Sequence, residues 1–354
     1  MWSVWPVAGV LMLATWGVRA SPAAAPQGAN PSAVALLERA VAASRNTSYA
    51  GTLVYRSEGV MEVLRVTHRV RNGQQDEHII TLTGTPRELL RIGNQLTCFF
   101  PRGRRVDLHN VPIKNLFAHL RGPALERLRE WYGFQSIAAD RVAGRNCLGV
   151  AVDPRDGYRY GYRVWVDQAT GVPLRVALVD GSARVLEQVM YTQIEFPTSI
   201  PDSAFVPTLK DAEGYRAVRQ KISAPLDDAT PPRLANDAAG GAWTFAAMPP
   251  GFTVTLQDQR HMPDRIGVVN HLMVSDGLSS VSVFAAQAEP AGAGLKGLSH
   301  IGAVHAYGRF LDGYHVTVVG EAPGRTVKMI GDALELQGQA NAGPPPALAT
   351  TAAH

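Results

Sequence analysis

The sequence has 354 residues, of which 46% are hydrophobic and 18% are charged, and its mean hydropathy is −0.04. These values predict a soluble globular protein of two domains and exclude one with several membrane spans. The net charge of +4 is unevenly spread: residues 31–200 carry 22 Lys and Arg against 16 Asp and Glu, a balance of +6, and residues 201–354 carry 11 against 14, a balance of −3. A basic first half suits anionic head groups or an acidic partner, but it lacks the dense clusters typical of nucleic-acid binding, which we exclude.

The amino terminus has the pattern of an export signal. Residues 1–18 are almost wholly apolar and carry no charged side chain, and small residues follow. This predicts a secretory signal at 1–20, cut after Ala20 or within 23–25; an uncleaved membrane anchor is the alternative. After a disordered leader at 21–30, residues 31–45 form an amphipathic helix, because Val34, Leu37 and Val41 share one stripe.

From residue 48 the pattern changes to strands separated by turn signals. We predict strands at 49–57, 60–71, 78–85, 88–92 and 95–100, two short helices opened by proline at 112–120 and 123–131, and further strands at 134–142, 147–152 and 186–196. Roughly nine or more antiparallel strands with helices to one side indicate an α+β, mainly antiparallel protein. The expected architecture is a half-open, curved β-barrel.

The most distinctive stretch is a long hairpin at 158–179. Alternation places Tyr162 and Val164 on one face and Arg163 and Trp165 on the other, and the turn lies between Asp167 and Pro173. Aromatic residues on both faces need apolar cover on both sides, as in a sheet that curls around an apolar interior. An ordinary sandwich hairpin is the alternative.

A second domain is expected after a proline-punctuated edge at 197–207. We assign the first domain to 31–206, a polar linker to 207–241 and a small antiparallel α+β domain with a helix at 326–336 to 242–337. Residues 338–354 form a low-complexity tail that we expect to be disordered.

Few residues point to catalysis. Residues 292–297 match G-x-G-x-x-G but precede no convincing helix, the histidines lack metal-ligand spacing, and no nucleophile motif occurs, so we expect neither an enzyme nor a metal or cofactor. A triad assembled from distant residues stays open. Two outcomes are also open for Cys98 and Cys147: a disulfide that closes a loop of about 50 residues and stabilises by up to roughly 4 kcal/mol, or two separately buried thiols.

Several motifs together resemble the RseB/MucB family of periplasmic regulators, which restrain the envelope-stress sigma-E response. The first half contributes Tyr49-Ala50-Gly51-Thr52-Leu53-Val54-Tyr55, Asp140-Arg141-Val142-Ala143-Gly144-Arg145, Asp153-Pro154-Arg155-Asp156-Gly157, Arg159-Tyr160-Gly161-Tyr162, Trp165-Val166-Asp167 and Gly171-Val172-Pro173-Leu174. The second half contributes Pro249-Pro250-Gly251-Phe252, Ser275-Asp276-Gly277-Leu278 and Gly320-Glu321-Ala322-Pro323. The resemblance covers about residues 31–336.

The resemblance implies a large domain similar to the lipoprotein carriers LolA and LolB, joined to a smaller antiparallel domain. It implies a periplasmic protein that binds the periplasmic part of an anti-sigma factor of the RseA/MucA kind and shields it from a DegS-type site-1 protease. Lipopolysaccharide or another lipid would release it. A LolA/LolB-like lipid or lipoprotein carrier is the alternative function, a secreted enzyme with a dispersed site is a more distant one, and homo-oligomerisation stays open.

Our site hypothesis places a lipid cavity in the first domain. An acyl chain contributes about 0.8 kcal/mol per buried CH₂, so some ten methylenes could offset several kcal/mol of partner binding. The residues expected to border the cavity are Phe99, Leu116, Phe117, Leu120, Trp131, Tyr162, Trp165 and Leu178. Arg102, Arg104 and Arg105 are expected to face head groups or the partner; the alternative is a packed core and a solvated basic loop.

Overall fold

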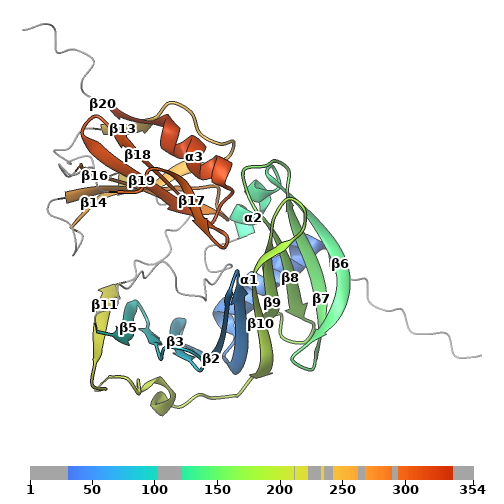
Figure 1. Ribbon diagram of the computed structural model, residues 1–354. Helices are drawn as coiled ribbons and strands as arrows, with labels where there is room; N and C mark the ends of the chain where they lie inside the picture. Colours follow the sequence, from blue (N-terminus) through green and yellow to red (C-terminus); the bar gives the residue numbers. More distant parts are fainter. Residues whose placement is uncertain are drawn as a thin grey trace, which may run out of the picture. The chain divides into compact units, whose positions relative to one another are not determined.

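The computed structural model describes residues 31–102, 122–210, 212–221, 233–234, 242–261, 268–288 and 294–337 (Figure 1). The predicted signal segment, the predicted helix at 112–120 and the C-terminal tail lie outside these ranges. Residues 32–354 group into one unit. Within the described part, every helix is too short or too polar to cross a bilayer.

The first half of the chain forms one eleven-stranded antiparallel sheet. Its spatial order is β11-β5-β4-β3-β2-β1-β10-β9-β8-β7-β6. The strands are β1 (Tyr49–Ser57), β2 (Val60–Arg71), β3 (Gln74–Thr81), β4 (Glu88–Ile92), β5 (Gln95–Pro101), β6 (Tyr132–Val142), β7 (Arg145–Pro154), β8 (Gly161–Asp167), β9 (Pro173–Val179), β10 (Val185–Glu195) and β11 (Tyr215–Lys221).

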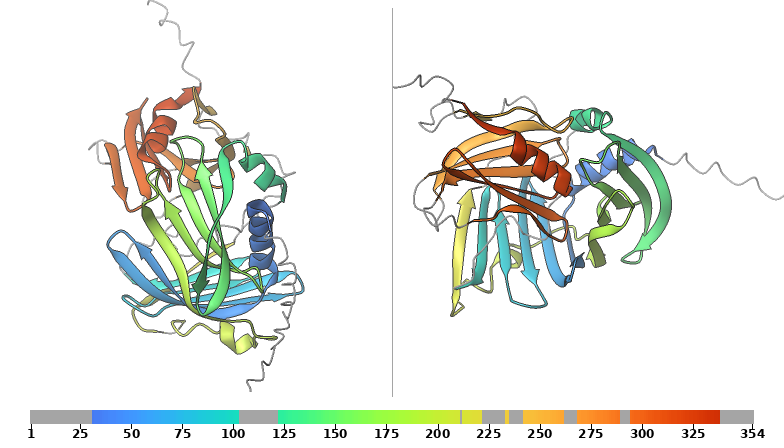
Figure 2. Two further views of the ribbon diagram at one scale, coloured as in Figure 1. Left: turned by 90° about the vertical axis from the view of Figure 1, so that its right-hand side faces the viewer. Right: turned by 45° about the horizontal axis from the view of Figure 1, so that its top comes forward.

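Two five-stranded meanders, β1 to β5 and β6 to β10, meet where β1 pairs with β10, and β11 adds the eleventh strand beside β5. Turn chemistry sets their reversals: Asn72 and Gly73 have φ of 53° and 75°, the left-handed conformation that a tight two-residue hairpin turn requires. Among the described strands, β6 and β11 end the sheet and do not pair with each other, so the curved sheet stays open (Figure 2). This confirms the predicted half-open architecture.

Two helices accompany the sheet. α1 (Ala33–Asn46) begins at Ser32, whose Oγ accepts a hydrogen bond from the Ala35 N–H at 3.2 Å. Its apolar side, including Leu36 and Leu37, is buried and packs toward β6 and β7. α2 (Gly122–Leu128) is the second helix of our prediction, but it ends three residues earlier than expected.

A short strap follows β10 and crosses beside β3. It contains the 3₁₀ turn η2 (Asp202–Phe205), and two buried charges hold it. The Arg69 guanidinium donates to Asp76 and Asp202, and the Glu88 carboxylate accepts hydrogen bonds from the Thr208 and Leu209 N–H groups at 3.1 Å each. The chain then enters β11, so part of the segment predicted as linker is a strand, because the free edge of β5 offers it a pairing partner.

The second half forms a seven-stranded sheet in the order β12-β14-β15-β16-β19-β18-β17 and a separate pair of β13 with β20. The strands are β12 (Arg233–Leu234), β13 (Ala242–Phe245), β14 (Thr253–His261), β15 (Val268–Ser275), β16 (Ser280–Gln287), β17 (Gly297–Ile301), β18 (Val304–Leu311), β19 (Tyr314–Gly320) and β20 (Leu334–Gln337). α3 (Gly324–Ala333) buries Val327 and Ile330 on this sheet. The predicted helix at 326–336 therefore ends early, because Leu334 turns into β20 and pairs with Phe245.

Candidate functional site

Three of the predicted cavity residues belong to one apolar cluster under α1. Tyr162 and Leu178 are direct cross-strand partners on β8 and β9, and both are buried. The partly buried Trp131, just before β6, packs against the same cluster, to which α1 contributes Leu36 and Leu37. Burial raises the pKa of Tyr162 well above its ordinary value, so its hydroxyl stays neutral.

Trp165 lies apart from these three. It is an odd number of residues from Tyr162 on β8, so its side chain points to the opposite face of the sheet. There the Arg175 guanidinium lies 3.3 Å from its ring centroid, and its Nε1 donates to the Ala138 carbonyl at 3.3 Å. Trp165 and Tyr162 therefore do not line one surface.

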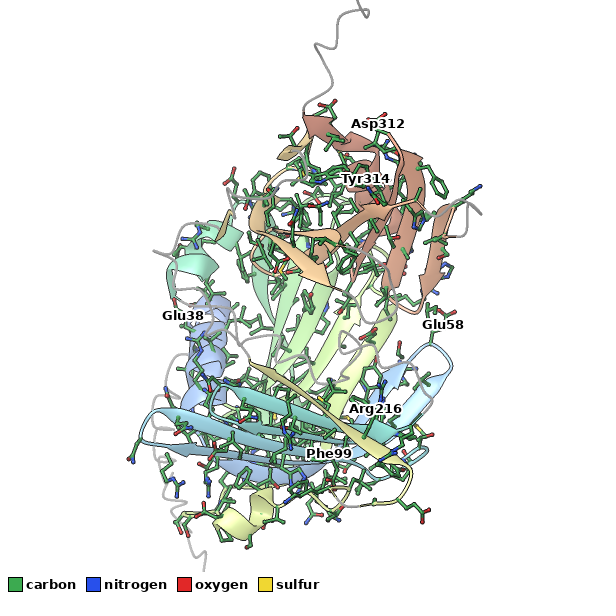
Figure 3. The ribbon with its side chains drawn as sticks, turned by 90° about the vertical axis from the view of Figure 1, so that its left-hand side faces the viewer. Glu38, Glu58, Phe99, Arg216, Asp312 and Tyr314 are labelled. Atoms are coloured by element: carbon green, nitrogen blue, oxygen red, sulfur yellow. The ribbon has the colours of Figure 1, made fainter. Side chains whose placement is uncertain are left out.

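Phe99 and Arg102 lie near the far edge of the sheet. Phe99 is buried on β5, opposite Ala217 of β11 (Figure 3). The Arg102 backbone N–H donates to the Gly214 carbonyl and its Nε to the Tyr215 carbonyl at 3.0 Å, so this residue fastens β11. The remaining predicted residues lie outside the described ranges: Leu116, Phe117, Leu120, Arg104 and Arg105.

Cys98 and Cys147 are free thiols in the structure. Both are buried, on β5 and β7, which are eight positions apart in the strand order of the sheet. The structure therefore has the second of the two predicted outcomes, without the disulfide. Burial raises the pKa of each thiol to about 11, which leaves them weak nucleophiles.

The most unusual charge in the described chain is Arg159, whose side chain is fully buried where the two sheets meet. Its Nη1 lies 3.4 Å from Oδ2 of Asp276, an equally buried carboxylate on the turn after β15, and its Nε lies 3.3 Å from Asp156 Oδ1. Its Nη2 donates to the Pro250 carbonyl. A residue of the first half therefore holds two segments of the second.

Aromatic rings surround this guanidinium. The ring centroids of Trp131, Tyr132 and Phe252 lie 5.2, 5.5 and 5.1 Å from its central carbon. The Tyr132 hydroxyl donates to Asp276 Oδ2 at 2.9 Å, and burial together with that carboxylate raises the pKa of Tyr132 well above its ordinary value. The hydroxyl therefore remains a donor.

Asp276 is held in place by its own turn. Its Oδ1 accepts hydrogen bonds from the N–H groups of Leu278 and Ser279 at 2.9 and 2.7 Å. Its second oxygen faces Tyr132 and Arg159 from the other sheet. The turn thus holds one carboxylate oxygen while the other faces the first sheet. We call Arg159, Asp276 and the neighbouring rings of Trp131, Tyr132 and Phe252 the joint.

Further contacts extend the joint on both sides. Thr326 Oγ1, at the start of α3, donates to the Tyr158 carbonyl at 2.6 Å. The Tyr160 hydroxyl lies 3.4 Å from His305 Nδ1 on β18. At the hairpin tips, a Cβ on Gly302 would lie 2.7 Å from Ser57 Oγ, so only glycine allows that approach.

These contacts involve four of the nine motifs that carry the family resemblance: 153–157, 159–162, 249–252 and 275–278. The motifs around Arg159, Gly251 and Asp276 come from distant parts of the sequence and converge on the joint. In the sequence, Arg159 and Asp276 each appear only as one residue of a motif, and no pattern assigns either of them a role. The available signal was an arginine inside an aromatic run and an Asp-Gly turn in the other half, but nothing in a single sequence indicates that they pair.

A polar array on the second sheet has the spacing of a catalytic triad. His271 Nδ1 lies 3.2 Å from Asp258 Oδ1, and His271 Nε2 lies 3.3 Å from Ser282 Oγ. However, Ser282 lies within β16 and is paired on both sides, with Met273 and Val319. A serine nucleophile is normally presented at a sharp turn beside free backbone donors, so we interpret this array as mutual hydrogen bonding on a sheet surface. Among the described residues, no cluster of His, Cys, Asp and Glu is suited to hold a metal ion.

One half-open antiparallel sheet and one mainly antiparallel sheet, joined through a buried ion pair, define a protein of the half-barrel class. The sequence model of the MucB/RseB N-terminal domain matches residues 32–209, and that of the MucB/RseB C-terminal domain matches residues 237–335. The chain therefore belongs to the MucB/RseB family.

Individual relatives agree with this assignment. The chain is 28% identical to the sigma factor AlgU regulatory protein MucB of Pseudomonas aeruginosa, over 83% of this chain and 88% of the relative. It is 29% identical to the sigma-E factor regulatory protein RseB of Salmonella typhimurium, over 87% of this chain and 92% of the relative. The solved MucA/MucB complex of Pseudomonas aeruginosa superposes with a TM-score of 0.66 at 26% identity, covering 86% of this chain and 99% of that chain.

Proposed function

We propose that this protein is a periplasmic regulator that binds the periplasmic region of an anti-sigma factor of the RseA/MucA kind. The observation that carries the proposal is the likeness, across both sheets, to a MucB chain solved in a complex with MucA. A crystal structure of MucB in complex with MucA(peri) resembles the chain to a similar degree, with a TM-score of 0.64. The relatives are named as regulatory proteins, which favours binding over catalysis.

The bound partner would be shielded from its site-1 protease. Shielding needs a surface that covers an extended segment, and a two-sheet protein with a fixed joint provides a surface whose parts keep a constant geometry. The buried Arg159 and Asp276 support this role because they specify how the two sheets meet.

A lipid would relieve the shielding by entering the apolar cluster that contains Tyr162, Leu178 and Trp131. An acyl chain can displace packed side chains only if it buries a comparable apolar area. Each buried CH₂ group of the lipid contributes about 0.8 kcal/mol of binding free energy. Ten buried methylenes would thus supply enough free energy to change partner affinity by several orders of magnitude.

A reconstituted cleavage assay tests the proposal. The anti-sigma factor's periplasmic region is incubated with its site-1 protease, with and without this protein, and with purified lipopolysaccharide. We expect the protein to slow cleavage and lipopolysaccharide to restore it. Unchanged cleavage on adding the protein would refute the regulatory function.

The alternative function is a lipid or lipoprotein carrier, which the half-open sheet with its internal helix favours. A carrier would transfer lipid to an acceptor without needing the second sheet. Transfer by a chain lacking residues 242–337, with no effect of the intact chain on cleavage, would favour the carrier.

A further inference from the structure

We infer that Arg159 and Asp276 are positioning residues that couple the apolar cluster under α1 to the second sheet, so that a lipid which displaces Trp131 opens the joint and weakens partner binding. This inference rests on the proposed function and concerns its regulation. At the joint, the Arg159 guanidinium faces two carboxylates, but its Nε and Nη1 have no hydrogen-bond partner.

The buried guanidinium is held by ion pairs without full hydrogen bonding. Its Nε and Nη1 lie 3.3 and 3.4 Å from carboxylate oxygens, yet neither makes a hydrogen bond of good geometry. When the joint opens, both N–H groups and the Asp276 carboxylate would regain water. A buried ion pair therefore resists separation less than an apolar contact of the same area, while it strongly disfavours any misaligned closed arrangement.

Trp131 connects this pair to the apolar cluster. One part of the residue packs against the cluster that holds Tyr162 and Leu178. Its ring also lies 5.2 Å from the Arg159 central carbon and directly against Gly251 of the second half. A ligand that displaces this single ring from the cluster would remove a cation–π partner of Arg159 and a contact with the second sheet together.

Gly251 allows the displacement to be imitated without a ligand. A Cβ at this position would lie 2.4 Å from Trp131 Cε2, and the residue has φ of +78°. Gly251→Ala should therefore push Trp131 away. Gly73→Ala is the matched control, because Gly73 has φ of +75° and no atom lies within 4 Å of its added Cβ, so it carries the same backbone strain without the clash.

The charge pair is tested by a second set of variants. Asp276→Asn keeps an oxygen for the N–H groups of its own turn but removes the charge that faces Arg159. Arg159→Gln removes the partner charge, whereas Arg159→Lys keeps it. If the joint depends on charge, Arg159→Lys should behave more like the unmodified protein than Arg159→Gln does, whereas a role in packing alone would not separate them.

The readout is the distance between spin labels at Ser182→Cys and Gln287→Cys. Both positions are exposed; Ser182 lies in the turn between β9 and β10 of the first sheet, and Gln287 ends β16 of the second. The two native cysteines are buried and should not be labelled. We expect one narrow distance distribution for the protein and for Gly73→Ala. Gly251→Ala, Asp276→Asn and Arg159→Gln should add a second, broader distribution, with affinity for the anti-sigma periplasmic region lowered at least tenfold.

Adding lipopolysaccharide to the labelled protein should produce the same second distribution. The inference is overturned if folded Gly251→Ala and Asp276→Asn keep the narrow distance distribution. It is equally overturned if lipopolysaccharide weakens partner binding while the distance distribution stays the same. It is also overturned if the joint opens and affinity does not fall. Failure of the proposed function is a different result, because the labelled protein would then bind no anti-sigma region while the distances could still change.

Discussion

His68 provides a quantitative test of the structure through acid stability. It lies on β2, 2% exposed and stacked on Tyr49 with ring centroids 5.0 Å apart, and neither ring nitrogen has a hydrogen-bond partner. Burial, assisted by the positive charge of Arg91 and opposed by Asp76, lowers the pKa of His68 from 6.5 to about 4. The folded protein therefore keeps this ring neutral at pH values where the unfolded chain protonates it.

The sign of the effect follows from proton binding. Between pH 6.5 and about 4 the unfolded chain binds the additional proton, so the free energy of unfolding decreases as the pH falls through this range. The two pKa values correspond to a loss of about 2 kcal/mol between pH 7 and pH 5. Glu77, whose Oε1 lies 3.9 Å from His68 Nδ1, has a pKa raised by burial and acts in the opposite direction. The comparison of variants is therefore more informative than the pH profile of the unmodified protein.

His68→Phe removes the titration and keeps the ring stacked on Tyr49. The free energy of unfolding is measured at pH 7 and pH 5 by urea unfolding, with tryptophan fluorescence as the signal. Between these pH values it should decrease by about 2 kcal/mol less in the variant than in the unmodified protein. Arg71→Gln, an exposed change on the same strand, should leave the interval unchanged. Equal losses in His68→Phe and the unmodified protein would show that His68 is protonated in the folded state, contrary to its burial.

Two further variants test the strap and the second sheet. Glu88→Ala should lower the free energy of unfolding by roughly 1–3 kcal/mol and speed proteolysis within residues 202–209, because the Thr208 and Leu209 N–H groups lose their acceptor. Glu88→Gln should have a smaller effect on both. Unchanged proteolysis in Glu88→Ala would contradict the anchoring role. Ile330→Ala should lower the free energy of unfolding by about 2–5 kcal/mol, because the side chain is fully buried between α3 and its sheet. The fluorescence of Trp243, which belongs to the same cluster, should report the unfolding. A decrease below about 1 kcal/mol would refute this packing.

The sequence predicted the local elements well where local chemistry decides them. Period-two alternation located the meander strands, and Asn72-Gly73 located a hairpin turn, because a left-handed turn depends on the residues that form it. β11 was missed, since its charged sequence has no strand signal and is extended only because the edge of β5 is available. The predicted helix at 326–336 includes Leu334, which is a strand residue in the structure. Leu334 is extended because it pairs with Phe245, and a contact between such distant residues leaves no local sequence signal.

The candidate site divides in the same way. Alternation correctly placed Tyr162 and Trp165 on opposite faces of β8, and a family likeness carried by ordered motifs was visible in the sequence alone. The sequence could not show that Arg159 meets Asp276, because the two residues are far apart in the chain and each looks like an ordinary strand or turn residue. Whether a charge is solvated or buried depends on what the rest of the chain packs around it, and only the tertiary structure decides that.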